Sequence, residues 1–344
     1  MTVFIILFIA SFLLNLSLMK WGHLLYFKST KSNQIQNIHQ GFVTRLGGLV
    51  IFLCSGFYLF FNFSDYQIFC LFSFIIVLPA LIEDLSIIIN PLIRLLLILL
   101  GSFLIIINFD QLPQFEFGYL NLIFNNHIFQ IIFFTLAMTT VINGQNIIDG
   151  TNGLSALTSM TIFVSLWYTG FILEDDNLTS ISFSVMLLLI SFLLFNYPFG
   201  KIFLGDMGSY FLGLLAAYLT IQTFANNPEL PSWSAVIILF YPTLEVVFSY
   251  FRKLANRESP FMPDSQHLHL KIFYLLSKNN PKKRLYNALV APFLSIIWLT
   301  PLTLLPLSFS LPHLSMIVLI ALIIIYLFFY FAIPSPHSDS KKIN

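Results

Sequence analysis

The residues best suited to chemistry are amide and carboxylate side chains that recur at every third position of one short segment. They are Asn143, Asn146, Asp149 and Asn152, in the run Asn-Gly-Gln-Asn-Ile-Ile-Asp-Gly-Thr-Asn-Gly-Leu between two apolar stretches. On an α-helix each step of three residues turns roughly 60° from the last, so the four cannot share one narrow face. Two glycines near the end of the run predict a break after Asp149, which would turn backbone N–H groups toward an anion. A polar interface between membrane helices is the other interpretation.

Carboxylates also stand at the end of one other apolar stretch and at the start of another. Glu83 and Asp84 end one stretch, where adjacent carboxylates repel each other unless a cation or a proton is present. Asp206 stands in Gly-Asp-Met-Gly-Ser and is predicted to be the N-cap of the next helix. A divalent metal is one explanation of these acids; a solvated helix end and ordinary capping are the others.

Basic residues accompany the acids. Arg45 opens the run Arg-Leu-Gly-Gly, Arg94 begins an apolar stretch, and Lys201 lies five residues before Asp206. Each of these cations could hold a phosphate, although Arg94 could also reach lipid headgroups. Lys201 could equally reflect the usual excess of basic residues in cytoplasmic loops.

A fourth group of polar residues lies in a basic loop. Asp264, His267 and His269 are followed by Lys271. Imidazole and ammonium donors suit contacts with phosphate, whereas a zinc site would require further ligands. A surface pair of histidines without a function is the alternative. Two acidic clusters, an Asn-rich turn and a basic loop together predict phosphoryl transfer, with a metal bridging phosphates.

The elements that must position these residues are membrane helices. Of the 344 residues, 58% are hydrophobic and 9% are charged, far below the roughly 25% charge of soluble domains. We predict an all-α, polytopic integral membrane protein with about eleven transmembrane helices. The predicted spans are 3–19, 43–62, 66–83, 91–109, 127–143, 153–172, 179–196, 208–225, 233–250, 286–306 and 314–332. Residues 1–344 form one predicted domain, whose largest loop covers 251–285.

The orientation follows from the basic residues. With the N-terminus outside, all sixteen Lys and Arg fall in loops of the opposite face, which therefore is predicted to be cytoplasmic, as is the C-terminus. Every polar cluster described above lies on that same face. A formal net charge of +1 argues against a nucleic-acid partner, and the lipid bilayer is the expected surroundings.

Taken in order, these motifs resemble the polyprenyl-phosphate N-acetylhexosamine-1-phosphate transferases, also called glycosyltransferase family 4, which include phospho-N-acetylmuramoyl-pentapeptide transferase. The resemblance covers almost the whole chain. The matching landmarks are Arg45-Leu-Gly-Gly, Glu83-Asp84, Asn143-x-x-Asn146-x-x-Asp149-Gly-x-Asn152-Gly-Leu, Gly205-Asp206-x-Gly-Ser and Ser259-Pro-Phe-x-Pro-Asp264-x-x-His267-Leu-His269.

The resemblance implies transfer of a sugar 1-phosphate from a UDP-sugar to undecaprenyl phosphate, with release of UMP. It implies a requirement for Mg²⁺ or Mn²⁺, a place in the inner (plasma) membrane, a role in starting a cell-surface polysaccharide, and a possible homodimer. By analogy Asp206, with Asp149, would ligate the metal, and Asp84 would bind or activate the lipid phosphate. Asn146 would help to organise the nucleotide.

The resemblance also assigns substrate contacts to the remaining polar residues. These are Arg45, Glu83, Arg94, Asn143, Asn152, Lys201, Asp264, His267 and His269. The chain departs from the family pattern at Glu83, at Asn152, where many members have Asp, and at Leu270, which replaces a third histidine. A transporter of nucleotide sugars or lipid-linked sugars, and an inactive paralogue, remain the alternative functions. Direct transfer and a phosphoenzyme intermediate both remain open as mechanisms.

Overall fold

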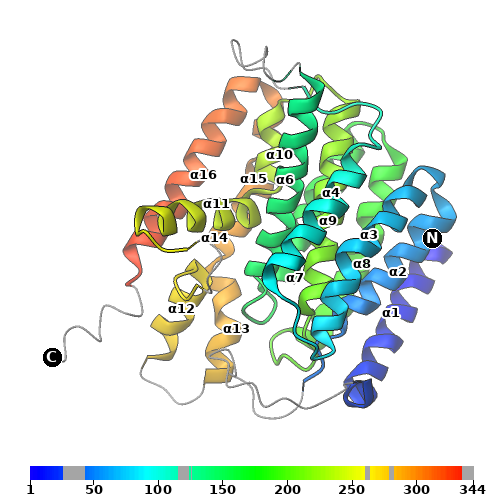
Figure 1. Ribbon diagram of the computed structural model, residues 1–344, viewed down its shortest axis with the longest axis vertical. Helices are drawn as coiled ribbons and strands as arrows, with labels where there is room; N and C mark the ends of the chain where they lie inside the picture. The colour runs from blue at the N-terminus through cyan, green and yellow to red at the C-terminus, as the bar shows by residue number, and fades with distance from the viewer. Residues whose placement is uncertain (26–42, 115–123, 125, 260–263, 279–282, 335–344) are drawn as a thin grey trace.

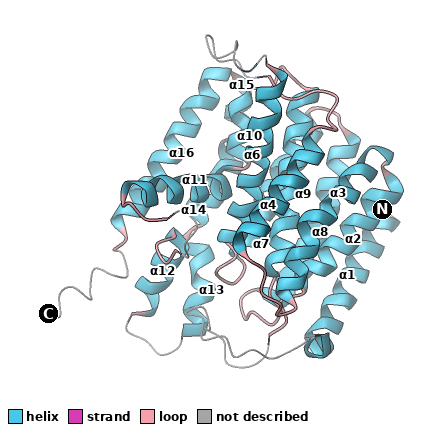
Figure 2. Ribbon diagram, in the orientation of Figure 1, coloured by secondary structure: helices cyan, strands magenta, loops and turns pink. Residues whose placement is uncertain are grey.

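The computed structural model describes residues 1–25, 43–114, 124, 126–259, 264–278 and 283–334. Within these residues the regular elements are helices, as Figure 2 shows, and the pairing of Thr44 with Ile202 is an isolated β-bridge. The helices are α1 (Thr2–Trp21), α2 (Gly47–Asn62), α3 (Gln67–Asp84), α4 (Pro91–Ile106), α6 (His127–Ile147), α7 (Leu154–Ile172), α8 (Asp176–Asn196), α9 (Gly205–Asn226), α10 (Ser232–Ile238), α11 (Phe240–Ala255), α12 (Leu268–Ser277), α13 (Lys283–Phe293), α14 (Ser295–Trp298), α15 (Thr300–Ser310) and α16 (Pro312–Ala332). The predicted all-α class is confirmed.

Many of these helices suit a bilayer. In the described part of the chain, 8 helical segments are long and apolar enough to cross a membrane, or 9 if α10 and α11 count as one broken span. The chain is therefore a multi-pass membrane protein. Helices α2 and α4 lie where spans were predicted but have 16 residues each, fewer than the roughly 20 that the hydrocarbon core requires. The total of eleven spans and the orientation remain predictions.

One predicted span is wrong as a straight helix. Residues 233–250 form α10 and α11, which meet at an angle of 87° (Figure 1). Pro242, the third residue of α11, has no backbone N–H to donate to the carbonyl of Ile238, which favours a break between the two helices. The sequence 251–285, predicted as a loop, contains the end of α11 and the whole of α12.

Helix α9 forms the centre of the molecule. It packs against α2, α3 and α6, and 94% of the residues in its most apolar 18-residue stretch are buried. Small residues allow this packing: a methyl group added at Gly48 of α2 would overlap Gly208 of α9. Figure 1 shows α1 and α16 at opposite edges of the bundle.

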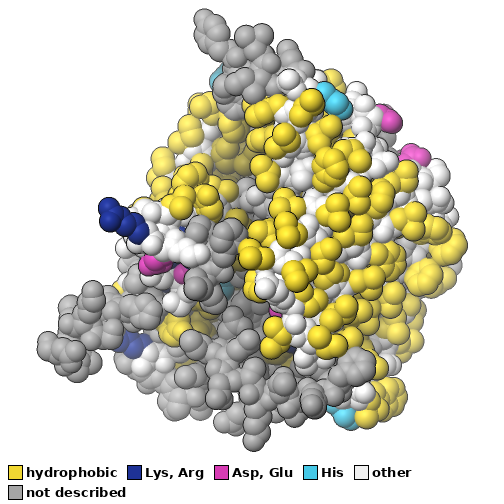
Figure 3. Space-filling model, viewed as in Figure 1, with side chains coloured by type: hydrophobic (Ala, Val, Ile, Leu, Met, Phe, Trp, Pro, Cys, Tyr) yellow, Lys and Arg dark blue, Asp and Glu magenta, His cyan; other side chains and the backbone are white. Residues whose placement is uncertain are grey.

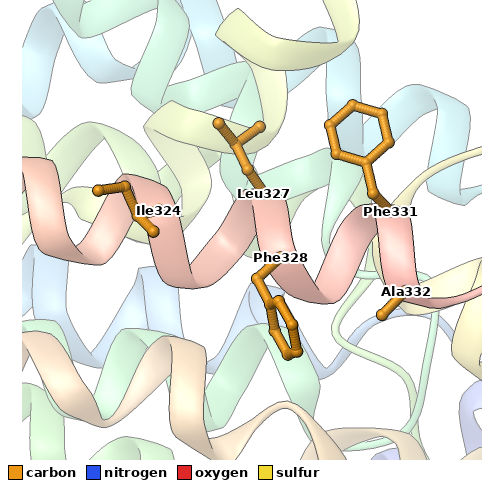
Figure 4. A pocket seen from close by; sticks show the side chains of 5 residues that line it. All are labelled: Ile324, Leu327, Phe328, Phe331 and Ala332. Atoms are coloured by element: carbon orange, nitrogen blue, oxygen red, sulfur yellow. The ribbon is translucent and has the colours of Figure 1, made fainter.

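The outer surface is apolar. Figure 3 shows hydrophobic side chains covering the face over α3 and α4, where Leu71, Phe74, Leu96 and Phe103 are exposed. Such a surface is typical of contact with lipid tails. A shallow hollow on α16, shown in Figure 4, is lined by the apolar residues Ile324, Leu327, Phe328, Phe331 and Ala332, so it offers no group for recognising a phosphate.

Candidate active site at the ends of α3, α6 and α9

The start of α9 is capped by an acid from another helix. The prediction that Asp206 is the N-cap is wrong, because Leu204 occupies that position and Asp206 lies in the first turn. The Asp84 carboxylate, at the end of α3, instead accepts the backbone N–H groups of Asp206 (3.0 Å) and Met207 (2.9 Å). A carboxylate at a helix N-terminus satisfies N–H groups that have no partner within the helix and is favoured by the helix dipole.

Glycine makes this approach possible. Gly205 has a φ of 77°, in the left-handed region. A methyl group at this position would overlap the carbonyl oxygen of Arg45 and would lie 2.6 Å from Asp84 Oδ2. The segment before α9 also accepts the N–H groups of Gly47 and Gly48 at its Phe203 and Leu204 carbonyls (3.0 and 2.8 Å). The starts of α2 and α9 are thereby joined through their backbones.

Two arginines hold the Asp206 carboxylate from opposite sides. Arg45 Nη2 lies 3.0 Å from Asp206 Oδ1, and Arg94 Nη1 lies 3.1 Å from Oδ2. Arg94 also pairs with Glu83 at 2.5 Å, and Arg45 Nε lies 3.5 Å from Asp84. The structure therefore brings together five residues that the sequence places up to 161 positions apart.

Helix α6, which packs against α9, carries the first two asparagines of the polar segment. The helix ends at Ile147, four residues beyond the predicted span and two before the predicted break. Its polar side chains are partly engaged: the Asn143 amide donates to the Thr139 carbonyl (2.8 Å), and the Asn146 side chain is hydrogen-bonded to Tyr210 of α9. Both residues remain partly accessible.

Asp149 lies in the loop between α6 and α7. Burial raises its pKa well above the usual value; the carboxylates of Asp206 and Asp84 raise it further, and Arg45 lowers it in part. Among the described residues, its carboxyl group has no hydrogen bond or ion pair. An acid without a partner, beside two other acids, is a site where a proton or a metal cation would be stabilised.

Asn152 makes hydrogen bonds that hold this loop in place. It is buried, its amide donates to the Pro198 carbonyl (2.9 Å), and its backbone N–H donates to Asn287 Oδ1 (2.6 Å). The next N–H, of Gly153, donates to Asn196 Oδ1 (2.8 Å). Neither Asn196 nor Asn287 was singled out from the sequence, because isolated asparagines carry no motif. Lys201, by contrast, is exposed in the loop before α9.

Residues 264–269, called the histidine loop below, are held against α11 by side-chain contacts. Asp264 forms an ion pair with Arg252 and accepts the N–H of Gln266 (2.8 Å). Burial raises the pKa of Asp264, but His267, the Gln266 N–H and Arg252 together leave it below the usual value. His267 Nδ1 lies 3.0 Å from a buried acid, Glu245.

His269 reaches the Asp149 loop. Its ring stacks on His267 with centroids 5.8 Å apart, and its Nε2 lies 2.5 Å from where a methyl group on Gly150 would be. Burial lowers the pKa of His269 to about 4, so this ring is neutral at pH 7. The structure thus places the histidine pair next to the residue that follows Asp149.

The donors suit a cation that keeps water or substrate ligands. Within the described residues, no group of three or more His, Cys, Asp or Glu side chains could hold a metal by itself. Mg²⁺ is usually bound through one or two carboxylates together with waters and substrate phosphates. The unpartnered Asp149 carboxyl and the Asp206 carboxylate are consistent with that smaller protein contribution.

Comparison with known proteins points to one family. The family model "Glycosyl transferase family 4" matches residues 66–224, which include Asp84, Asp149 and Asp206. The undecaprenyl-phosphate alpha-N-acetylglucosaminyl 1-phosphate transferase of Thermotoga maritima is 32% identical over 138 residues, covering 40% of this chain and 41% of the relative. The protein of the same name from Salmonella typhi is 25% identical over 257 residues, with 67% and 65% covered.

A third relative is the probable undecaprenyl-phosphate N-acetylglucosaminyl 1-phosphate transferase of Bacillus subtilis. It is 28% identical over 257 residues, covering 69% of this chain and 67% of the relative. The matches thus span from 41% to 67% of the length of these relatives. The segment 66–224, which contains the acids gathered at α3, α6 and α9, is thus similar to glycosyl transferase family 4.

Proposed function

We propose that this protein transfers an N-acetylhexosamine 1-phosphate from a UDP-sugar to undecaprenyl phosphate, releasing UMP. The reaction would start the synthesis of a cell-surface polysaccharide in the inner membrane, with the site on the cytoplasmic face. The observation that carries the proposal is the convergence of Asp84, Asp206 and two arginines at the start of α9. The names of the relatives support the lipid substrate.

The arginines are the groups best placed to receive phosphates. The Arg45 side chain is 45% exposed, so it can meet a substrate while its guanidinium still contacts Asp206. A guanidinium offers several N–H donors in a plane, which matches the oxygens of a phosphate. Arg94 is less exposed, at 23%, and its pairing with Glu83 and Asp206 suits it to holding those acids in place.

Asp206 and Asp149 are the residues that would hold a divalent cation, Mg²⁺ or Mn²⁺. When bound, the cation would neutralise charge on the diphosphate of the sugar nucleotide. Burial and the neighbouring carboxylates raise the pKa of Asp149, and a bound cation would favour its ionised form. Removal of Mg²⁺ by a chelator should therefore stop turnover, and added Mg²⁺ should restore it.

Direct transfer is the mechanism that the geometry favours. A phosphate monoester has a second pKa near 6 and is largely dianionic at pH 7, so the lipid phosphate needs no strong base. One of its oxygens would bond to the β-phosphorus of the UDP-sugar as the bond to the bridging oxygen breaks, and that oxygen leaves with UMP. Asp84 is 1% exposed and both of its oxygens accept hydrogen bonds, which argues against its acting as the nucleophile.

The test is an assay of purified protein in liposomes with undecaprenyl phosphate, Mg²⁺ and a panel of UDP-sugars. We expect release of UMP and formation of a lipid-linked sugar with at least one donor. Asp206→Asn and Asp149→Asn should each lower turnover at least ~100-fold, whereas the matched change Asp110→Asn, at an exposed position beyond the other end of α4, should not. Normal turnover in either site variant would refute the assignment of that residue.

The same liposome assay distinguishes a transferase from a transporter. A transporter would accumulate intact labelled nucleotide sugar or move a lipid-linked sugar across the bilayer without releasing UMP. The two arginines proposed to receive phosphates lie just before α2 and in the first turn of α4, and the acids lie at the ends of α3 and α9. Transporter sites usually lie near the middle of the bilayer instead. Uptake without UMP release would overturn the proposed transferase.

A further inference from the structure

A second buried acid lies behind the histidine loop, on a helix that the catalytic cluster does not use. Glu245 belongs to α11, just beyond the 87° break after α10, and is 1% exposed. Its Oε1 contacts His267 Nδ1 at 3.0 Å and accepts the backbone N–H of Leu268 at 3.1 Å. Its Oε2 accepts the hydroxyl of Tyr326 from α16 at 3.0 Å. A buried ionisable group within a membrane protein usually serves a function.

These contacts determine how the His267 ring is held. A carboxylate oxygen can only accept, so Nδ1 of His267 must carry the proton that it donates to Glu245. The other ring nitrogen, Nε2, lies 3.7 Å from Asp264 Oδ2. A hydrogen bond to one ring nitrogen thus selects the state of the other.

The contacts also fix the start of α12. His267 is the N-cap of this helix and Leu268 is its first residue, so the Glu245 carboxylate caps α12 from a different helix. At the other end of the first turn, Lys271 Nζ donates to the Tyr330 carbonyl of α16 (2.5 Å) and lies 3.9 Å from the centre of the Tyr330 ring. The loop is therefore held between α11 and α16.

A chain of contacts connects Glu245 with the Asp149 loop. The His267 ring stacks on His269 with an angle of 8° between the rings, and His269 Nε2 packs against Gly150. His269 is 1% exposed, and its Nδ1 has no hydrogen-bond partner among the described residues. A buried ring with an unpaired nitrogen keeps its place only if its neighbours hold it there.

We propose that Glu245 is a positioning residue: it holds His267 as the tautomer protonated at Nδ1 and, through the stacked ring of His269, sets the histidine pair against Gly150 beside Asp149. The inference rests on the proposed transferase function in assigning the histidines to a phosphate-bearing substrate. Because Glu245 is buried, we assign it no contact with substrate. Its effect on turnover passes through His267.

A double-mutant cycle tests this dependence. Glu245→Ala and His267→Ala should each lower kcat by about 10²-fold, as expected when a catalytic group is misplaced by about 1 Å. The double variant should be no slower than His267→Ala alone, because Glu245 would have nothing left to position. If the two losses multiply, Glu245 acts independently of His267 and the proposal is overturned.

Conservative changes separate positioning from folding. Glu245→Gln keeps an oxygen that can accept from His267 and Leu268, so it should retain kcat within about 10-fold, while the thermal transition of every variant is measured in parallel. Tyr326→Phe removes only the Oε2 contact and should lower kcat less than about 3-fold. If Glu245→Ala recovers full kcat at an assay temperature below its own transition, its role is purely structural and the proposal fails.

A spectroscopic measurement keeps the inference separate from the proposed function. The ¹⁵N shifts of ring nitrogens report which nitrogen carries the proton, and His267→Gln identifies the signal of this residue in protein labelled at histidine. We expect Nδ1–H in the unaltered protein and a shift toward the Nε2–H form in Glu245→Ala. An unchanged tautomer would overturn the positioning role even if the protein is an active transferase, and the expected change would support it even if no UMP is released.

Discussion

Replacement of Gly205 by alanine is the most direct perturbation of the candidate site. The residue has a φ of 77°, which costs an alanine about 1–2 kcal/mol. The added methyl group would lie 2.6 Å from Asp84 Oδ2, so it would displace the carboxylate from at least one of its two backbone N–H partners. Loss of one hydrogen bond to a charged group costs about 1.5–3 kcal/mol. Together these give a destabilisation of roughly 2.5–5 kcal/mol.

The expected change in melting temperature follows from this range. Soluble proteins unfold with an entropy of about 2.1 cal/mol/K per residue, which for 344 residues corresponds to roughly 0.7 kcal/mol/K. Gly205→Ala should therefore lower Tm by about 4 °C or more in detergent, because a membrane protein that keeps its helices on unfolding has a smaller entropy change. UMP release should fall with it, since Asp206 belongs to the same helical turn.

Gly56→Ala is the matched control. A methyl group there would meet no atom within 4 Å, and the position lies inside α2. Alanine should stabilise this helix by roughly 0.5–1 kcal/mol relative to glycine. Thermal unfolding and UMP release measured for both variants decide the matter: if Gly205→Ala matches Gly56→Ala in both, the close approach of Asp84 to α9 is not what supports the site.

Three other perturbations have defined outcomes. Because the pKa of Asp149 is raised in the folded protein, its contribution to stability is complete below pH 3.8 and is lost as the pH rises toward the pKa of the folded state. Thermal unfolding without metal should therefore show a smaller loss of stability from pH 4 upward in Asp149→Asn than in the unaltered protein. Asn196→Leu would leave two buried backbone groups unpaired, one of them the Gly153 N–H, and should destabilise by about 2–5 kcal/mol in thermal unfolding. Gly144→Ala would make α6 overlap the carbonyl of Pro242 and should cost roughly 1–3 kcal/mol in the same measurement.

Hydropathy predicted where helices lie because the bilayer selects runs of apolar residues, and these runs are visible locally. It could not reveal that 233–250 changes direction, because a sum of hydrophobicity contains no information about the path of the backbone. Pro242 was the available signal, since a proline removes one hydrogen bond wherever it stands within a helix. The ends of helices were similarly uncertain: α6 extends to Ile147 because its polar residues continue the backbone hydrogen bonds.

The candidate site was predictable as a set of residues but not as a set of contacts. The order of motifs indicated that Arg45, Asp84 and Asp206 belong together, and the structure joins them. Which acid caps α9 could not be read locally, because Asp206 has the usual type and place for a cap, whereas the actual cap lies 122 residues earlier. The contact of Glu245 with His267 could not be predicted either, since this hydrogen bond exists only after α11 has turned away from α10.

The balance of charge in the site bears on the order in which ligands bind. Four acids face two guanidinium groups; they are Glu83, Asp84, Asp149 and Asp206, with Arg45 and Arg94. The start of α9 contributes about half a positive charge, so even with this contribution the four acids leave no surplus of positive charge in the site. A sugar diphosphate would bring about two further negative charges into a poorly solvated place, which is unfavourable unless a cation comes with it. We therefore expect UDP-sugar to bind measurably more tightly with Mg²⁺ than without it, and equal affinity in a titration of the two states would show that the arginines alone compensate the diphosphate.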